Sequence, residues 1–178
     1  MHAIHLKAIA KDITPSQLEF GAQYYIKRRP VVDAISQEYG ISVDIAAPAF
    51  TLTLTNLGEV PEDLSILLSR FDQLVKKGGP THPNAVQQWN NIWNKRMHYT
   101  EVMPDESHRS DYTKALLGEK RVAPTGVKIM LNTIWKDFSN DVPTFRKAFF
   151  DVADDLNIAP ITLQAATWKY ARDNRNNF

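Results

Sequence analysis

The candidate catalytic and ligand-binding residues lie between Gly118 and Arg146, in the stretch GEKRVAPTGVKIMLNTIWKDFSNDVPTFR. Basic residues precede Pro124-Thr125-Gly126, and Lys128 follows this run. Because proline fixes φ and glycine permits positive φ, their close spacing predicts a tight turn. An isolated aspartate, Asp141, follows an apolar run and precedes Arg146. The expected order is therefore helix, tight turn, helix, acidic loop, helix.

This order predicts a phosphate-binding surface. A tight turn between two helices exposes backbone N–H groups that can hold a phosphate. Lys120, Arg121 and Lys128 lie close to this turn in the sequence and would add positive charge to it. Asp141 would lie near a helix N-terminus, where the helix dipole keeps a carboxylate ionised and suits it to act as a base or to stabilise a cation. The alternative interpretation is that Asp141 only caps the helix that follows it.

Two sets of short patterns resemble those of known proteins. Gly126-x-Lys128, followed by Asp141 and Arg146 after an apolar helix, resembles the hairpin and aspartate of helix-hairpin-helix DNA glycosylases of the endonuclease III type. The run Tyr39–Ala47 and the pattern P-x-x-x-Q-A-x-T-W-x-x-x-R over Pro160–Arg172 resemble a group of small uncharacterised phage-type proteins. That group is distantly similar to the same glycosylases.

The resemblance implies both a fold and an activity. It implies an all-α protein that grips double-stranded DNA through the hairpin and flips a nucleotide out of the duplex. Lys128 would match the lysine that attacks the sugar C1′ in lyase-competent members. Asp141 would match the aspartate that activates the nucleophile and stabilises the developing oxocarbenium charge. The resemblance therefore makes Asp141 and Lys128 the candidate catalytic residues. With it, the residues expected on the DNA phosphates are Gly126, Lys120, Arg121 and Arg146.

The chain also departs from the glycosylase pattern. Thr125 stands where the hairpin has a glycine or another small residue, and Val142-Pro143-Thr144 lacks the histidine that is usual after the aspartate. Two hypotheses from different classes follow. One is a DNA-associated protein with a glycosylase-like core that acts on a flipped base. The other is a non-catalytic helical protein-interaction module of the phage accessory type, in which the turn is structural and Asp141 only caps.

Composition bounds both hypotheses. The 178 residues predict a single domain over residues 1–178, with a weaker subdivision near the loop 78–84. A net charge of +1 lacks the basic excess of strong non-specific nucleic-acid binders and so favours the interaction module. The absence of cysteine excludes thiol catalysis, disulfides and an iron–sulfur cluster. No histidine has the spacing of a helical zinc site, so neither a metal nor a cofactor is predicted.

The sequence predicts a protein outside membranes. The N-terminus lacks a basic region followed by a long apolar run, and no stretch approaches the roughly 20 apolar residues that a membrane span needs. We therefore expect a soluble, cytoplasmic protein with DNA or another protein as its partner.

The spacing of residues that start and end helices predicts an all-α orthogonal bundle. Alternation of period two is scarce, while Gly, Pro, Ser and Thr recur at the spacing of helix ends. Thr14 before Pro15 predicts a helix start, and Gly40 predicts a helix end. Between them, Arg29-Pro30 is expected to interrupt the helix, because the residue before proline avoids the α region. The alternating run FTLTLTNLG from Phe50 is expected to be the tail of a buried helix, since it has no partner strand.

Three further segments carry specific expectations. Residues 85–103 predict one helix that Pro104 ends, with an apolar face of Val86, Trp89, Ile92, Trp93 and Met97. The two acidic residues Asp154-Asp155 are expected on a solvated helix face. Trp168 shares an apolar helical face, so we interpret it as a core residue rather than a base-stacking platform.

Overall fold

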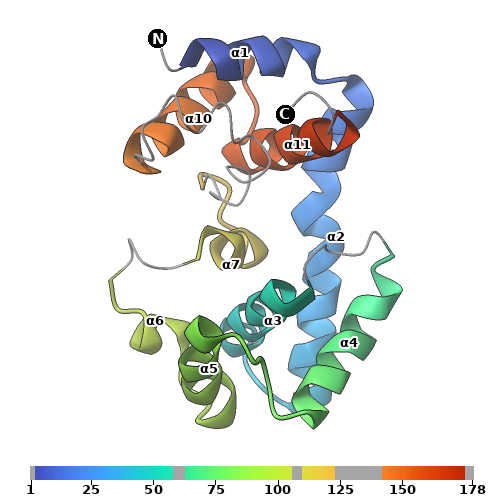
Figure 1. The fold of residues 1–178 in the computed structure, drawn as a ribbon, viewed down its shortest axis with the longest axis vertical. Helices are drawn as coiled ribbons and strands as arrows, with labels where there is room; N and C mark the ends of the chain where they lie inside the picture. The colour runs from blue at the N-terminus through green and yellow to red at the C-terminus, as the bar shows by residue number, and fades with distance from the viewer. Residues whose placement is uncertain (1–2, 58–62, 106–109, 123–141, 175–178) are drawn as a thin grey trace. The chain divides into compact units, whose positions relative to one another are not determined.

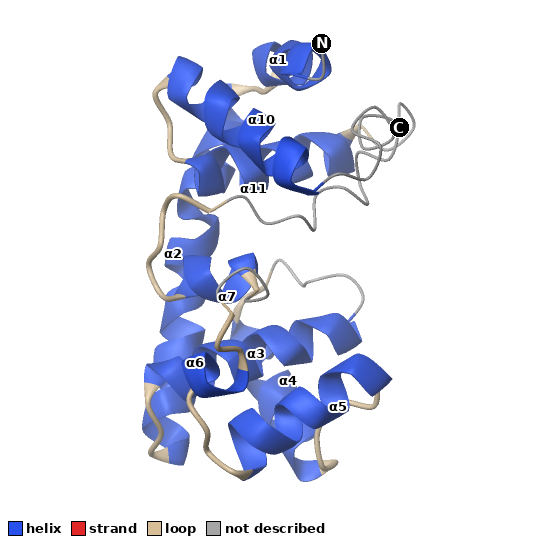
Figure 2. Ribbon diagram, turned by 90° about the vertical axis from the view of Figure 1, so that its left-hand side faces the viewer, coloured by secondary structure: helices blue, strands red, loops and turns tan. Residues whose placement is uncertain are grey.

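The computed structural model describes residues 3–57, 63–105, 110–122 and 142–174 (Figure 1). Over these ranges the chain forms helices and connecting loops without a strand (Figure 2), which confirms the predicted all-α class. No helix in the described ranges is long and apolar enough to cross a membrane. The described elements are α1 (Ala3–Asp12), α2 (Pro15–Tyr39), α3 (Val43–Leu57), α4 (Ser65–Lys76), α5 (Pro83–Trp89), the π-helical turn η1 (Asn90–Asn94), α6 (Tyr99–Val102), α7 (Asp111–Leu116), α10 (Val142–Leu156) and α11 (Pro160–Asp173).

The chain divides into two compact units. Unit 1 comprises Met1–Ile26 and Gly118–Phe178, and unit 2 comprises Lys27–Leu117. Helix α2 contributes its first half to unit 1 and its second half to unit 2. Residues 78–84, where a weak subdivision was predicted, lie inside unit 2. The single domain over residues 1–178 stays a prediction.

Unit 1 is built on the packing of α1, α10 and α11 against one another. Gly21 of α2 lies against α11 so closely that a Cβ atom there would stand 2.4 Å from the carbonyl oxygen of Thr162 and 2.8 Å from the amide nitrogen of Ala166. Only glycine permits this approach, since both neighbours are backbone atoms. The buried cluster consists of Ile9, Ile13, Ala148, Phe149, Val152, Ala153, Leu163, Ala166 and Ala171.

The two ends of α2 follow the predicted chemistry. The Thr14 Oγ1 atom accepts from the Gln17 amide at 3.2 Å, and the Gln17 side-chain oxygen accepts from the Thr14 amide at 2.9 Å. This reciprocal capping box fixes the start of the helix. Gly40, with φ of +62°, ends it in the left-handed conformation that glycine adopts without strain.

Four aromatic side chains pack together in unit 2, and we name them the aromatic cluster: Tyr39, Phe71, Trp89 and Trp93. Phe71 is fully buried and meets the Trp93 ring edge-on at 5.2 Å between centroids. Trp89 and Trp93 stack at 5.3 Å. Gly79 lies directly against Trp89, where a Cβ atom would approach the indole nitrogen to 2.3 Å. Large rings from α2, α4, α5 and η1 therefore form the centre of this unit.

The predicted interruption at Arg29-Pro30 is wrong, because α2 continues through Pro30 to Tyr39. Proline cannot donate to the carbonyl of Ile26, which costs about 3 kcal/mol in a helix interior. Beyond the proline, Val32 and Ile35 are fully buried. Burying such side chains contributes roughly 1.5–3 kcal/mol each. Tertiary packing thus outweighs the local preference.

The predicted helix over residues 85–103 is also wrong in its length. Helix α5 passes into η1, where the Lys95 amide donates to the Asn90 carbonyl at 3.0 Å across a π-helical turn. Arg96 then adopts φ of +54° and ends the helix, and α6 begins afresh at Tyr99. On the predicted apolar face Val86 is 39% exposed, whereas Trp89, Ile92 and Trp93 are buried.

The alternating run from Phe50 is helical, as predicted, and forms the second half of α3. Phe50 is fully buried and Leu54 is buried as well. The Thr51 hydroxyl donates to the Ala47 carbonyl at 3.0 Å, and the Thr53 hydroxyl donates to the Phe50 carbonyl at 2.6 Å. Threonine hydroxyls can therefore be buried on a helix, because carbonyl oxygens of the preceding turn accept their hydrogen bonds.

Candidate nucleic-acid interface

Half of the predicted site residues lie within the described part of the chain. Lys120, Arg121 and Arg146 are described, and all three belong to unit 1. The candidate catalytic residues Asp141 and Lys128, together with Gly126, lie outside the described residues.

The segment that follows α7 places Arg121 in contact with α10. Gly118 has φ of +100°, which turns the chain just beyond α7, and Val122 is buried. Between them Lys120 and Arg121 are exposed. The two terminal nitrogens of the Arg121 guanidinium donate to the two carboxylate oxygens of Asp154 at 3.0 Å each. The guanidinium also lies 5.0 Å from the centre of the Phe150 ring, within cation–π range.

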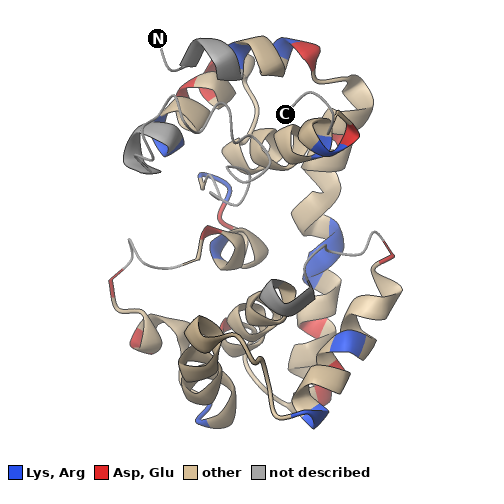
Figure 3. Cartoon of the chain, in the orientation of Figure 1, with Lys and Arg blue, Asp and Glu red and all other residues tan. Residues whose placement is uncertain are grey.

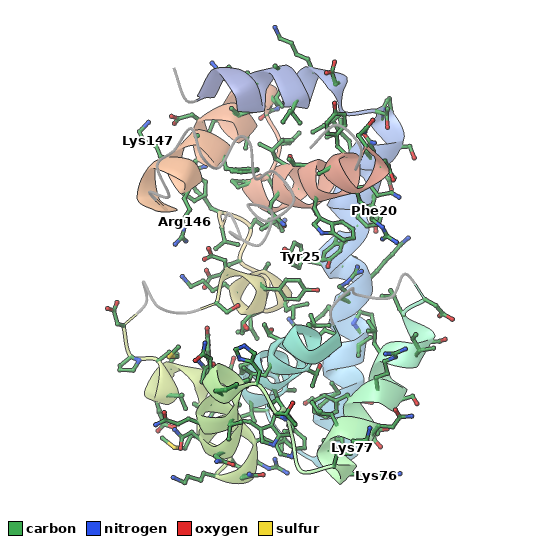
Figure 4. The ribbon with its side chains drawn as sticks, in the orientation of Figure 1. Phe20, Tyr25, Lys76, Lys77, Arg146 and Lys147 are labelled. Carbon is green, nitrogen blue, oxygen red and sulfur yellow. The ribbon has the colours of Figure 1, made fainter. Side chains whose placement is uncertain are left out.

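Arg146 lies on the same stretch of α10. It precedes Phe150 by one helical turn, and side chains at this spacing are neighbours on the helix surface. Phe150 therefore has Arg146 beside it along the helix and Arg121 over its ring. Lys147 leaves α10 on a different side from Arg146 (Figure 4) and donates to Asp151 at 2.6 Å.

Four of these side chains form what we name the α10 charge network: Arg121, Lys147, Asp151 and Asp154. The hydrogen bonds to Asp154 raise the pKa of Arg121, and the hydrogen bonds from Arg121 lower the pKa of Asp154. Two cations and two anions balance within the network, and both signs occur along α10 (Figure 3). The same unit also contains the cations Lys120 and Arg146.

The network is exposed and therefore exchangeable. The side chains of Arg121 and Asp154 are 63% and 56% exposed. An ion pair with this exposure contributes little to stability, because solvent screens it. The same two N–H groups that hold a carboxylate bidentately can hold a phosphate. Arg121 can thus transfer from Asp154 to a phosphate at little cost in stability.

Sequence reasoning missed the partners of Arg121. The prediction that Asp154-Asp155 lie on a solvated face is confirmed, since both side chains are exposed. The spacing of Lys147, Phe150, Asp151 and Asp154 on one helix could have indicated a shared face. No local signal links Arg121 to Asp154, because 33 residues separate them.

Trp168 is partly buried and packs against the buried cluster of unit 1, so the core interpretation is confirmed only in part. Its ring stacks on Phe20 of α2 at 6.0 Å, and the Arg172 guanidinium lies 5.3 Å from it. Close by in unit 1, the Tyr25 hydroxyl donates to the Gln164 side chain at 2.8 Å and joins α2 to α11. These contacts assign Trp168 to the packing between α2 and α11.

Two further searches, for metal-binding groups in the described ranges and for similar proteins, found no match. Among the described residues no group of three or more His, Asp or Glu residues could hold a metal ion. Comparison of the chain with models of protein families, with curated proteins and with solved structures gives no match in any of the three.

Proposed function

We propose that this chain is a DNA-associated protein whose orthogonal bundle contains a glycosylase-like helix-hairpin-helix core, and that it acts on a flipped base at the N-glycosidic bond. One observation carries the proposal. Arg121, which is far from α10 in sequence, lies over the ring of Phe150, and Arg146 precedes Phe150 by one turn of the same helix. Arginine side chains on and against one helix are suited to bind phosphates of a duplex backbone.

The described residues on both sides of the predicted turn belong to α10 or contact it. Just before residues 123–141 Val122 is buried and Arg121 is tied to Asp154, near the C-terminal end of α10. Just after them α10 begins at Val142. These two attachment points are twelve residues apart on one helix, or about 18 Å at 1.5 Å per residue. The residues that flank the predicted turn are therefore anchored on the helix that carries Arg146 and contacts Arg121.

In the proposed reaction Lys128 and Asp141 have the roles that the glycosylase resemblance implies. The Asp141 carboxylate takes a proton from the Lys128 ammonium and stabilises the oxocarbenium charge as the N-glycosidic bond breaks. The Lys128 amine then forms a bond to the sugar C1′, and the base leaves with the bonding electron pair and takes up a proton from water. Lys120, Arg121 and Arg146 together with the amides at Gly126 hold the backbone of the DNA.

Salt-dependent binding to duplex DNA tests the proposal. The logarithm of the association constant should fall linearly with the logarithm of salt concentration, and the slope should weaken by about 0.9 for each phosphate contact removed. Arg121→Gln and Arg146→Gln should each weaken the slope by about this amount. Lys11→Gln, which removes an exposed cation of α1, is the matched control and should leave the slope unchanged.

The same preparations test catalysis. Asp141→Asn should abolish release of a base from damaged or mismatched duplexes while leaving the binding constant intact. Release at the wild-type rate in this variant would remove Asp141 from the mechanism.

A non-catalytic protein-interaction module is the second candidate, and the α10 charge network favours it. Arg121 and Lys147 are each paired with a carboxylate of α10, so these cations have partners without DNA. Such a module has no affinity for duplex DNA at either high or low salt. The salt titration therefore separates the two candidates.

A further inference from the structure

Asp154 holds Arg121 in the geometry that a phosphate would use. Both terminal nitrogens of the guanidinium donate to this one carboxylate, and the Phe150 ring lies under it. Arginine recognises carboxylate and phosphate through the same planar fork. The carboxylate of Asp154 is thus a stand-in for a phosphate group.

The position of Asp154 in α10 is unfavourable for the helix itself. Asp154 and Asp155 lie in the last turn of α10, which contains no basic residue. Carboxylates near a helix C-terminus are destabilised by the helix dipole. Asp154 therefore does not stabilise α10 through the helix dipole. Its favourable interaction is the pair of hydrogen bonds from Arg121.

We propose that Asp154 occupies the guanidinium of Arg121 in the free protein and is displaced by a backbone phosphate when double-stranded DNA binds. This inference rests on the proposed function and adds a regulatory role to the same site. The exchange conserves two hydrogen bonds to Arg121. It leaves the freed carboxylate close to the incoming phosphate, and Asp151 lies close enough to Arg121 to act on its charge. Asp154 thus lowers the affinity for DNA and restricts binding to ligands that compete with it.

Two neighbouring aspartates allow a matched test. Asp154→Asn and Asp155→Asn each remove one negative charge from the last turn of α10, but only the first frees Arg121. Asp155 is paired instead with Lys7 at 3.1 Å, also on the surface. Affinity for a short DNA duplex should rise by about two- to fivefold more in Asp154→Asn than in Asp155→Asn, as expected for release of an exposed ion pair.

A double-mutant cycle identifies the mechanism. In an Arg121→Gln background the extra gain from Asp154→Asn should vanish, since no guanidinium remains to be released. Circular dichroism melts of all variants establish that each is folded, and replacing an acid at this helix end is not expected to lower the melting temperature.

The outcomes distinguish the inference from the proposed function. Equal affinities of the Asp154 and Asp155 variants, or a gain that persists without Arg121, would overturn the displacement while leaving DNA association standing. Absence of binding in both the wild type and the Asp154 variant would overturn DNA association, and the displacement with it.

Discussion

Polar contacts in unit 2 and on α10 of unit 1 differ in their surroundings. In unit 2 the Tyr39 hydroxyl donates to Asp72 at 2.7 Å, and the Tyr39 ring meets the fully buried Phe71 edge-on. On α10 the Arg121–Asp154 pair has two hydrogen bonds, yet both side chains are more than half exposed. Burial, rather than the number of hydrogen bonds, decides how much a polar contact contributes to stability. The partly buried Tyr39–Asp72 contact is therefore expected to stabilise its unit more than the exposed Arg121–Asp154 pair does.

The largest expected effect is on the aromatic cluster of unit 2. Phe71→Ala removes a fully buried ring that contacts Tyr39, Trp89 and Trp93. The free energy of unfolding should fall by about 3–5 kcal/mol, because a large cavity remains. Urea denaturation followed by tryptophan fluorescence measures the change.

Phe150→Ala is the control for that substitution in unit 1. Phe150 is partly buried and lies beneath the exposed Arg121, so its loss should cost clearly less than the loss of Phe71. Equal costs for the two substitutions would contradict the distinction between a structural cluster and an exchangeable surface.

A smaller effect is expected for the hydroxyl of Tyr39. Tyr39→Phe removes the hydrogen bond to Asp72 and should lower the free energy of unfolding by about 1 kcal/mol at neutral pH. Burial, and then the hydrogen bond to Asp72, raise the pKa of the Tyr39 phenol. The folded protein therefore keeps this proton at a pH where the unfolded chain loses it, near pH 10.

The sign of the pH dependence follows from this shift. The contribution of Tyr39 is complete below the pKa of the unfolded chain and declines as the pH rises above about 10. The difference in unfolding free energy between wild type and Tyr39→Phe should accordingly shrink from pH 9 to pH 11. A difference that stays constant over this range would show that the phenol ionises equally in both states.

Local chemistry predicted much of the fold. Thr14 with Pro15 and Gly40 mark helix ends through capping and backbone conformation, which depend on a few neighbouring residues. Pro30 and Arg96 were the failures. At Pro30 burial of the following residues overrides the local preference, and at Arg96 a guanidinium over the Trp93 ring accompanies an unusual backbone conformation.

The candidate site was less accessible to sequence reasoning. Spacing could identify Arg121 and Arg146 as cations near a predicted turn, but it could not identify what neutralises them. The pairing of Arg121 with Asp154 arises only when α10 and the segment after α7 come together. Tertiary contacts of this kind have no periodicity, so no pattern within either segment predicts them.

The smallest expected effect concerns the second ion pair of the α10 charge network. Lys147→Gln removes the contact with Asp151, in which Lys147 and Asp151 are 74% and 52% exposed. Its free energy of unfolding should differ from wild type by less than about 0.5 kcal/mol, the value typical of helix pairs four residues apart. Lys169→Gln on α11 is the comparison, because Lys169 is only 25% exposed, pairs with Asp173 at the same spacing and also lies 5.6 Å from the centre of the Phe20 ring. The Lys169 substitution should therefore cost more in urea denaturation, and the reverse order would contradict the rule that exposure makes these pairs exchangeable.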